Sequence, residues 1–264
     1  MDLAPETVAW LPSLRANSGA RLRLFCLAHA GGGASLFCRW SAGLPAAIEI
    51  LPVQLPGHQQ RLSEPPYREM EPLVEALSRV VQPYVDVPFA LFGHSMGALI
   101  GFELARRLRR QYGVQAAGFL VAACRAPQLP LPQPSLHELP DAELIAAVQR
   151  RFGGVPEQVA GDAELMRLLV PALRADLAMV ETYRYGEEVP LSCPICVLGG
   201  TDDPEVAASD LAAWRRQTYG SFSLRMFPGG HFFLDAARGS ILRLVSRQLE
   251  PLLGGFSPGG AERP

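Results

Sequence analysis

The sequence predicts an α/β fold with a mostly parallel central sheet and helices on both of its faces. Short apolar and β-branched runs alternate along the chain with longer segments of helical periodicity, which is typical of parallel strands joined by helical crossovers. The 264 residues are 48% hydrophobic and 19% charged, so the chain is long and apolar enough to bury a large core. We therefore expect residues 1–264 to form a single domain.

The expected elements alternate between strand and helix over most of the chain. Each strand is a short run of apolar or β-branched residues, and each helix is a longer segment with apolar residues on one face. In chain order, they are a strand near 22–28, a helix near 35–43, a strand near 48–54, a helix near 69–82, a strand near 88–93, a helix near 96–111, and strands near 117–123 and 194–199, followed by a helix near 207–218, a strand near 222–227 and a helix near 235–252.

The interval 125–190 breaks this alternation. It opens with a proline-dense stretch from Pro127 to Pro134 and becomes helical at Asp141–Phe152 and again from about Ala163 to Tyr185. Apolar residues recur on one face of both helices, and Pro171 should bend the second. Two amphipathic helices inserted between the fourth and fifth strands indicate a helical lid over the carboxyl edge of the sheet. Ordinary core helices packed elsewhere on the sheet are the alternative.

Composition and charge argue against several classes of function. The net charge of −2 gives no reason to expect nucleic acid or a membrane surface as a partner. No apolar run approaches the roughly 20 residues that span a bilayer, and the start Met1–Glu6 does not resemble a signal peptide, so we expect a cytoplasmic protein. All 24 basic residues are arginine, which excludes catalysis by lysine. The Gly- and Pro-rich tail 254–264 is expected to be flexible.

The five cysteines are expected to be reduced thiols, because their number is odd and no secretion signal is evident. Cys193 and Cys196 form a lone C-x-x-C, which could be redox-active or half of a metal site. No second pair of Cys or His lies nearby to complete such a site. Two small apolar residues entering a buried strand are the favoured interpretation, and we expect no bound metal.

Ser95 is the candidate nucleophile. Residues Leu91–Gly97 read Leu-Phe-Gly-His-Ser-Met-Gly, an apolar strand that runs into Gly-x-Ser-x-Gly and is followed by an apolar-periodic helix. This pattern is typical of a serine held at a sharp strand-to-helix turn with its hydroxyl exposed. Glycines at 93 and 97 remove the clashes that so tight a turn creates. A plain surface turn is the alternative for the motif alone, and the flanking strand and helix argue against it.

A serine needs a general base before it can attack, and five histidines compete for that role. His231 follows the strand expected at 222–227 and lies in Pro-Gly-Gly-His-Phe-Phe-Leu, where the glycines allow a loop that leans over the sheet edge. We therefore expect His231 to be the base. The other histidines are expected to be structural or to line a pocket, with the one inside the elbow packed or hydrogen-bonded behind the turn: His29, His58, His94 and His137.

The acid that would orient this base follows the strand near 194–199, where Gly-Gly-Thr-Asp-Asp-Pro-Glu-Val contains Asp202 and Asp203. Successive residues that leave a strand point in different directions, so only one aspartate should reach His231. We choose Asp203, because Gly-x-x-Asp-Pro-x-Val is a common form of the acid loop, and Asp202 is the alternative. The order Ser95, Asp203, His231 is the one expected for an α/β-hydrolase fold.

An oxyanion that forms during acyl transfer needs two backbone N–H donors already in place. Met96 supplies one, because it starts a helix whose first N–H groups are free. The second donor should come from the small-residue loop His29–Ala34, where Ala30 is our first choice and Gly31 the next. A loop that cradles a nucleotide phosphate is the alternative, but the spacing is neither G-x-G-x-x-G nor a Walker sequence.

With these motifs placed, the chain resembles the type II thioesterases, stand-alone editing enzymes of polyketide and nonribosomal peptide assembly lines. The resemblance extends over nearly the whole chain. The motifs that carry it are His29-Ala30-Gly31-Gly32, Leu55-Pro56-Gly57, Phe92-Gly93-His94-Ser95-Met96-Gly97-Ala98, Phe152-Gly153-Gly154, Leu173-Arg174-Ala175-Asp176, Gly199-Gly200-Thr201-Asp202-Asp203 and Gly229-Gly230-His231-Phe232-Phe233. The resemblance implies that the catalytic residues are Ser95, Asp203 and His231 and that the oxyanion donors are Ala30 and Met96.

The resemblance also implies a substrate: an acyl group in thioester linkage to the phosphopantetheine arm of a carrier protein. Ser95 would attack the thioester carbonyl, the carrier thiol would leave, and water activated by His231 would hydrolyse the acyl-serine. Such a reaction requires no metal or bound cofactor. The partners of the protein would be acyl or peptidyl carrier protein domains, from which it would remove stalled or wrong acyl groups. The chain is compatible with a monomer.

Two rival functions remain open at this point. An esterase, lipase or peptidase would share the same three catalytic residues and differ in the leaving group. A non-catalytic relative would bind a ligand or a carrier without turnover, although an intact set of catalytic residues argues against it. Several arginines could contact an acidic carrier or the pantetheine phosphate: Arg39, Arg61, Arg125 and Arg174.

Overall fold

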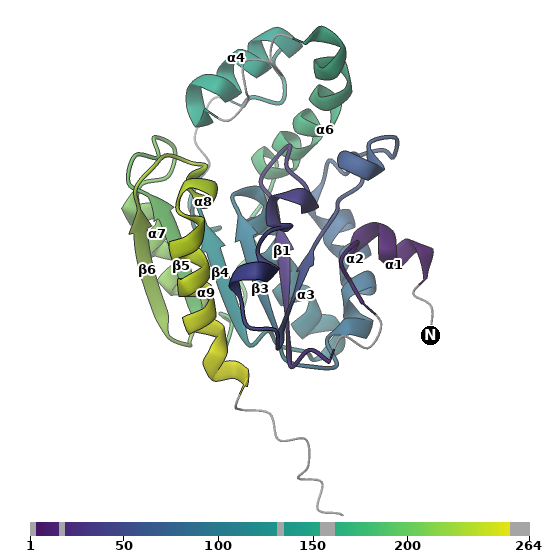
Figure 1. Cartoon of the computed structure of the whole chain (residues 1–264). Coiled ribbons are helices and arrows are strands. Elements are labelled where there is room, and N and C mark those ends of the chain that lie inside the picture. Colours follow the sequence, from purple (N-terminus) through teal and green to yellow (C-terminus); the bar gives the residue numbers. More distant parts are fainter. Residues whose placement is uncertain (1–3, 16–18, 131–134, 154–161, 254–264) are drawn as a thin grey trace, which may run out of the picture.

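The computed structural model describes residues 4–15, 19–130, 135–153 and 162–253 (Figure 1). Six strands form one sheet in the order β2-β1-β3-β4-β5-β6, and every neighbouring pair is parallel. All six expected strands are present, so the predicted parallel α/β fold is confirmed. The strands are β1 (Leu22–Leu27), β2 (Ile48–Pro52), β3 (Phe89–His94), β4 (Gly118–Ala122), β5 (Ile195–Gly200) and β6 (Phe222–Phe227).

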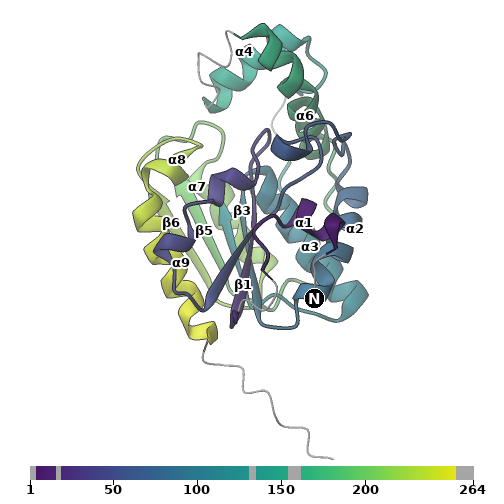
Figure 2. The same ribbon diagram turned by 45° about the vertical axis from the view of Figure 1, so that its right-hand side comes forward.

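Helices cover both faces of this sheet, because successive strand residues point to opposite sides. In β1, Phe25 joins a core that includes residues of α1, α2 and α3, whereas its neighbours Leu24 and Cys26 join a second core with α9. Figure 2 shows these two layers on either side of the strands. The helices concerned are α1 (Pro5–Trp10), α2 (Met70–Val81), α3 (Met96–Tyr112) and α9 (Arg238–Leu253).

Three expected helices differ from the structure. The segment near 35–43 forms two 3₁₀ turns rather than one α-helix. Its buried aromatic residues Phe37 and Trp40 are three positions apart, which suits the three-residue repeat of a 3₁₀ helix, and both rings pack edge-on against Phe92. The other two expected helices are each divided in two: the segment near 207–218 forms α7 and η5, and the segment near 235–252 forms the end of α8 and then α9. The shorter elements are η1 (Ala34–Phe37), η2 (Ser41–Gly43), η3 (Gln59–Arg61), η4 (Gln82–Tyr84), α7 (Ala208–Ala212), η5 (Ala213–Gln217) and α8 (Phe233–Ala236).

Two helices between β4 and β5 lie beyond the sheet: α4 (Asp141–Phe152) and α6 (Ala163–Glu181). We call them the cap helices; Figures 1 and 2 show them together above the edge where β3, β4 and β5 end. They share a small core of their own that includes Leu144, Val148 and Leu177. Two helices are therefore present where the sequence predicts an insertion, and their action as a lid, within 125–190, stays a prediction.

The helix α6 continues through Pro171 and ends four residues before the expected boundary at Tyr185. The expected flexible tail, 254–264, lies outside the described residues. Within the described part of the chain, no helix combines the length and apolar character that crossing a bilayer requires.

Candidate active site

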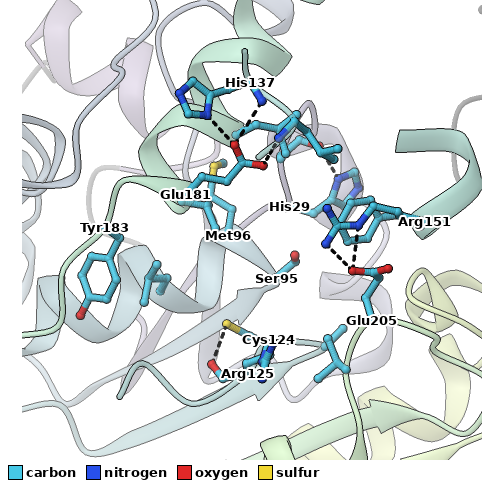
Figure 3. Close-up of a pocket in the computed structure, with 18 of the residues that line it drawn as sticks. His29, Ser95, Met96, Cys124, Arg125, His137, Arg151, Glu181, Tyr183 and Glu205 are labelled. Carbon is cyan, nitrogen blue, oxygen red and sulfur yellow. Dashed lines mark hydrogen bonds and ion pairs between the residues drawn. The ribbon is translucent and has the colours of Figure 1, made fainter. Parts of the chain in front are cut away.

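Ser95 occupies the sharp turn between β3 and α3. Its backbone angles, φ 53° and ψ −118°, are strained for a residue with a side chain. The glycines on either side make this turn possible. A Cβ on Gly93 would overlap the backbone of α3, and one on Gly97 would overlap the backbone of β1 at Leu27. The serine hydroxyl is thereby held at the carboxyl end of the sheet, where it faces a cavity (Figure 3).

Ser95, His231 and Asp203 form a continuous chain of hydrogen bonds. The Oγ of Ser95 lies 3.0 Å from Nε2 of His231, and Nδ1 of His231 lies 2.8 Å from Oδ2 of Asp203. Because a carboxylate only accepts, Nδ1 carries the hydrogen and donates to Asp203, which leaves Nε2 free to accept the serine hydroxyl. The side chain of Asp203 is 1% exposed, and its other oxygen accepts from the Glu205 N–H at 2.9 Å.

Asp202 has a different position. It is exposed, and its Oδ2 accepts from the Gly229 N–H at 3.2 Å, so it closes the base of the loop that carries His231. Of the two adjacent aspartates, only Asp203 contacts the imidazole ring. This arrangement agrees with the expectation that only one of two successive residues leaving a strand reaches the imidazole, and with our choice of Asp203, which rested on the Gly-x-x-Asp-Pro-x-Val pattern.

Two free backbone donors line the same cavity as Ser95: the N–H groups of Ala30 and Met96. Neither has a hydrogen-bond acceptor among the described residues. Met96 is the first residue of α3, where the helix exposes free N–H groups and a partial positive charge. The N–H of Gly31, our second choice, is already engaged, because it donates to Oδ2 of Asp176 at 2.7 Å. The two free donors are those that an oxyanion would require.

Two uncharged histidines surround the base. His94 donates from Nε2 to the carbonyl of His231 at 2.9 Å, behind the elbow as expected. Burial holds the pKa of His94 well below its ordinary value, and burial also lowers the pKa of His29. The His29 ring packs edge-on against His94 and against Phe232, with centroid distances of 5.1 and 4.8 Å. Ring packing and one hydrogen bond therefore fix the loop of His231 without adding a charge beside it.

The cavity in front of Ser95 has a volume of about 780 Å³, within the range of sites for small organic molecules. Its apolar wall comes from α3, from the loop after β4 and from both cap helices. Figure 3 shows Ser95 with the Arg151–Glu205 pair on one side and the His137–Glu181 pair on another. The cavity can therefore hold an apolar chain next to the serine. Its apolar lining includes Leu99, Leu129, Val148, Leu173, Leu177 and Val180.

The end of α4 packs onto the loops that carry the acid and the base. The ring of Phe152 lies 5.0 Å from the His231 ring. Arg151 donates from Nε and Nη2 to one carboxylate oxygen of Glu205, at 3.0 and 2.6 Å. Glu205 follows Asp203 by two residues. These contacts could not be predicted from the sequence, because the spacing of residues within a helix does not show which distant loop the helix faces.

A second polar pair was also missed: His58 and Asp176, 118 positions apart, whose side chains lie 2.8 Å from each other. One signal in the sequence could have pointed to it. Asp176 lies on the same helical face as Leu173 and next to Leu177, so a carboxylate occurs on an otherwise apolar face. Such a group needs a buried partner.

Three of the four arginines considered for carrier contacts are engaged within the protein, and only Arg39 is exposed. These three form ion pairs with nearby carboxylates: Arg61 with Glu64, Arg125 with Asp210 and Arg174 with Asp141.

The cysteines are all free thiols. Burial raises the pKa of Cys193 to about 11 and also raises the pKa of Cys196, so both are protonated at neutral pH. Within the described residues, no group of three or more His, Cys, Asp or Glu side chains is placed to hold a metal ion.

Comparison with known proteins identifies close relatives. Residues 22–249 match the thioesterase domain family. The gramicidin S biosynthesis protein GrsT of Aneurinibacillus migulanus is 42% identical over 96% of this chain and 98% of its own. Thioesterase PikA5 of Streptomyces venezuelae is 40% identical over 86% and 80%. The solved structure of the type II thioesterase BorB from the borrelidin biosynthetic cluster is 37% identical, with a TM-score of 0.81 over 92% of this chain and 97% of BorB.

Proposed function

Because this chain belongs to the thioesterase family, we propose that its substrate is an acyl group in thioester linkage to the phosphopantetheine arm of a carrier protein. Relatives named for gramicidin S biosynthesis and for the borrelidin cluster support this substrate class, since such pathways carry their intermediates as thioesters. The observation that carries the proposal is the hydrogen-bonded chain Ser95–His231–Asp203 beside an apolar cavity.

The first half of the reaction transfers the acyl group to the enzyme. His231 takes the proton of the Ser95 hydroxyl at Nε2 while Oγ bonds to the thioester carbonyl carbon. Asp203 stabilises the imidazolium that results. The carbonyl oxygen becomes negative and accepts hydrogen bonds from the N–H groups of Ala30 and Met96. The carbon–sulfur bond then breaks, the pantetheine sulfur receives the proton from His231, and an acyl-serine ester remains.

The second half releases the acid. Water enters where the thiol left, gives a proton to Nε2 of His231 and bonds to the ester carbonyl carbon. The same two N–H groups stabilise the second oxyanion. When the carbon–oxygen bond to Ser95 breaks, the proton returns from His231 to Oγ, and the free carboxylic acid departs. The reaction as written uses no metal or cofactor.

The cap helices contribute the binding of the acyl chain. Leu173 and Leu177 of α6 and Val148 of α4 line the cavity, so an apolar chain of the substrate would be buried against them. Phe152 covers one side of the His231 ring. An apolar roof of this kind excludes bulk water from the reacting groups and strengthens hydrogen bonds to the oxyanion.

The substrate class is tested by comparing hydrolysis of an acyl-carrier protein, the matched acyl-pantetheine thioester and the matched oxygen ester. We expect the highest kcat/KM for the carrier-bound thioester. Ser95→Ala should lower kcat by about 10⁶-fold, and a serine elsewhere on the surface, Ser246→Ala, provides the control. A clear preference for the oxygen ester would instead support an esterase. Binding of the carrier without turnover by the wild-type chain would support a non-catalytic relative.

A further inference from the structure

His58 and Asp176 form a buried pair outside the cavity and outside the chain of Ser95, His231 and Asp203. Their side chains are 4% and 1% exposed, and Nε2 of His58 lies 2.8 Å from Oδ2 of Asp176. His58 comes from the loop after β2, whereas Asp176 comes from the cap helix α6. The pair therefore connects the body of the protein to the cap.

Both members of this pair are charged. Nδ1 of His58 lies 3.0 Å from the carbonyl of Pro56, and Nε2 faces the carboxylate of Asp176. Carbonyl and carboxylate oxygens only accept, so both ring nitrogens donate and the ring is an imidazolium. Burial by itself lowers the pKa of His58, but the hydrogen bond and charge of Asp176 outweigh burial and raise it. Removing two charges from water is costly, so the pair is a weak device for stability alone.

The carboxylate of Asp176 also holds the loop that supplies the Ala30 N–H. Its Oδ2 accepts from the Gly31 N–H at 2.7 Å, and the carbonyl of that same peptide group accepts from Nδ1 of His29 at 2.9 Å. The peptide group between Ala30 and Gly31 is therefore held at both ends. The preceding peptide group has its carbonyl bonded to the Gly32 N–H at 2.9 Å. Only its N–H, that of Ala30, is left to point at a substrate.

Gly31 has a φ of +73°, and because glycine adopts many backbone conformations with ease, contacts from outside the loop help to hold it in this one. Leu173 of α6 packs next to it: a Cβ built on Gly31 would lie 3.4 Å from Cδ1 of Leu173. Leu173 and Leu177, which lie on either side of Asp176 in α6, both line the cavity. One face of α6 therefore lines the cavity and also contacts the loop that supplies the Ala30 N–H.

We propose that Asp176, charged and oriented by His58, is a positioning residue that fixes the Ala30 N–H as an oxyanion donor and links it to the cap helix α6. This inference rests on the proposed function, because it assumes that Ala30 stabilises an oxyanion. Asp176 touches no substrate. It acts through the Gly31 peptide group, so its loss should weaken binding of the transition state and leave binding of the ground state unchanged.

The test compares Asp176→Asn and His58→Gln with the wild type and with Glu49→Gln. The control removes a carboxylate that is 8% exposed and paired to Arg23 at 3.0 Å, far from the cavity. Two ligands are used: an acyl trifluoromethyl ketone, which bonds to Ser95 and forms an oxyanion, and an acyl-pantetheine thioether, which cannot react. We expect both test variants to lose about 10- to 100-fold in kcat and in affinity for the ketone, which is less than the loss on removing a donor itself. Their KM and their affinity for the thioether should stay within about threefold of the wild-type values.

The proposal would be overturned if Asp176→Asn and His58→Gln both fold and both bind the ketone as tightly as the wild type. Parallel loss of ketone and thioether affinity would also overturn it, because a merely structural role weakens both. If Asp176→Asn does not fold, Asp176→Glu takes its place: it keeps the charge but shifts the carboxylate, and positioning requires it to lose ketone affinity. If the wild type hydrolyses no acyl thioester, the proposed function fails, while the ketone comparison still decides whether Asp176 positions the donor.

Discussion

Individual side chains carry the chemistry, and the choice between Asp202 and Asp203 shows how far a sequence can assign them. The Gly-x-x-Asp-Pro-x-Val pattern predicted the residue that contacts His231 in the structure, because backbone direction at the end of a strand is a local property. Ser95 could also be placed locally, since its strained turn needs glycines at 93 and 97. The role of Asp203 in catalysis stays a prediction.

Substituting each aspartate separately tests that role. Asp203→Asn should lower kcat by about 10⁴-fold, because an amide in this position favours the wrong tautomer of His231. Asp202→Asn should change kcat by less than about tenfold, since its carboxylate accepts from the Thr201 hydroxyl and the Gly229 N–H and does not contact His231. Steady-state kinetics on the same acyl thioester compare the two. Equal losses in both variants would show that the acid has been assigned to the wrong residue.

His94 predicts a pH dependence of stability. It is neutral in the folded protein, where burial holds its pKa well below 6.5, whereas in the unfolded chain it takes up a proton near that value. The unfolded state therefore binds more protons below pH 6.5, and the free energy of unfolding falls as the pH drops through this window. The slope contributed by one proton is about 1.4 kcal/mol per pH unit.

Urea unfolding at a series of pH values measures this slope. His94→Asn keeps a donor toward the His231 carbonyl but cannot titrate, so the stability of this variant should fall less steeply just below pH 6.5. Ser246→Ala, which changes no titratable group, is the control and should keep the wild-type slope. Identical slopes for the wild type and His94→Asn would show that His94 does not titrate in this way.

At the scale of secondary structure, long amphipathic segments and buried strands could be predicted, and short segments could not. The helix α3 matches its prediction to within one residue, because its apolar periodicity extends over several turns. The segment near 35–43 is too short for period 3.6 to be told from period 3, and the spacing of Phe37 and Trp40 favours 3₁₀ turns. Periodicity likewise did not show that α4 would face the loop of Asp203.

The contact between α4 and the loop of Asp203 should restrain α4, so breaking this contact should make α4 more mobile. Glu205→Gln removes the ion pair with Arg151, whose side chains are 18% and 20% exposed. Partly exposed pairs contribute roughly 0.2–1 kcal/mol, so amide hydrogen exchange in α4 should become about 1.4- to fivefold faster. Exchange measured by mass spectrometry should stay unchanged in α9. The control is Glu75→Gln, which breaks a pair with Arg79 on α2. Unchanged exchange in α4 of the Glu205→Gln variant would show that the Arg151–Glu205 pair does not restrain this helix.

At the scale of the whole molecule, the parallel α/β fold and the resemblance to type II thioesterases are both confirmed. The order of the motifs along the chain was sufficient to predict that Ser95, Asp203 and His231 lie close together, because parallel strands bring their carboxyl ends to one edge of the sheet. The pairing of His58 with Asp176 spans 118 positions and depends on how the cap is docked. Such a contact follows from packing and could not be predicted from spacing.

In the proposed reaction, Ser95 carries the acyl group from the carrier protein to water. This step can be tested by mixing the protein with an acyl-carrier protein, quenching in acid within milliseconds and mapping the peptides by mass spectrometry. We expect one acyl group on the peptide that contains Ser95, and none on the Ser95→Ala protein. An acyl group on any other residue, or undiminished hydrolysis by Ser95→Ala, would contradict it.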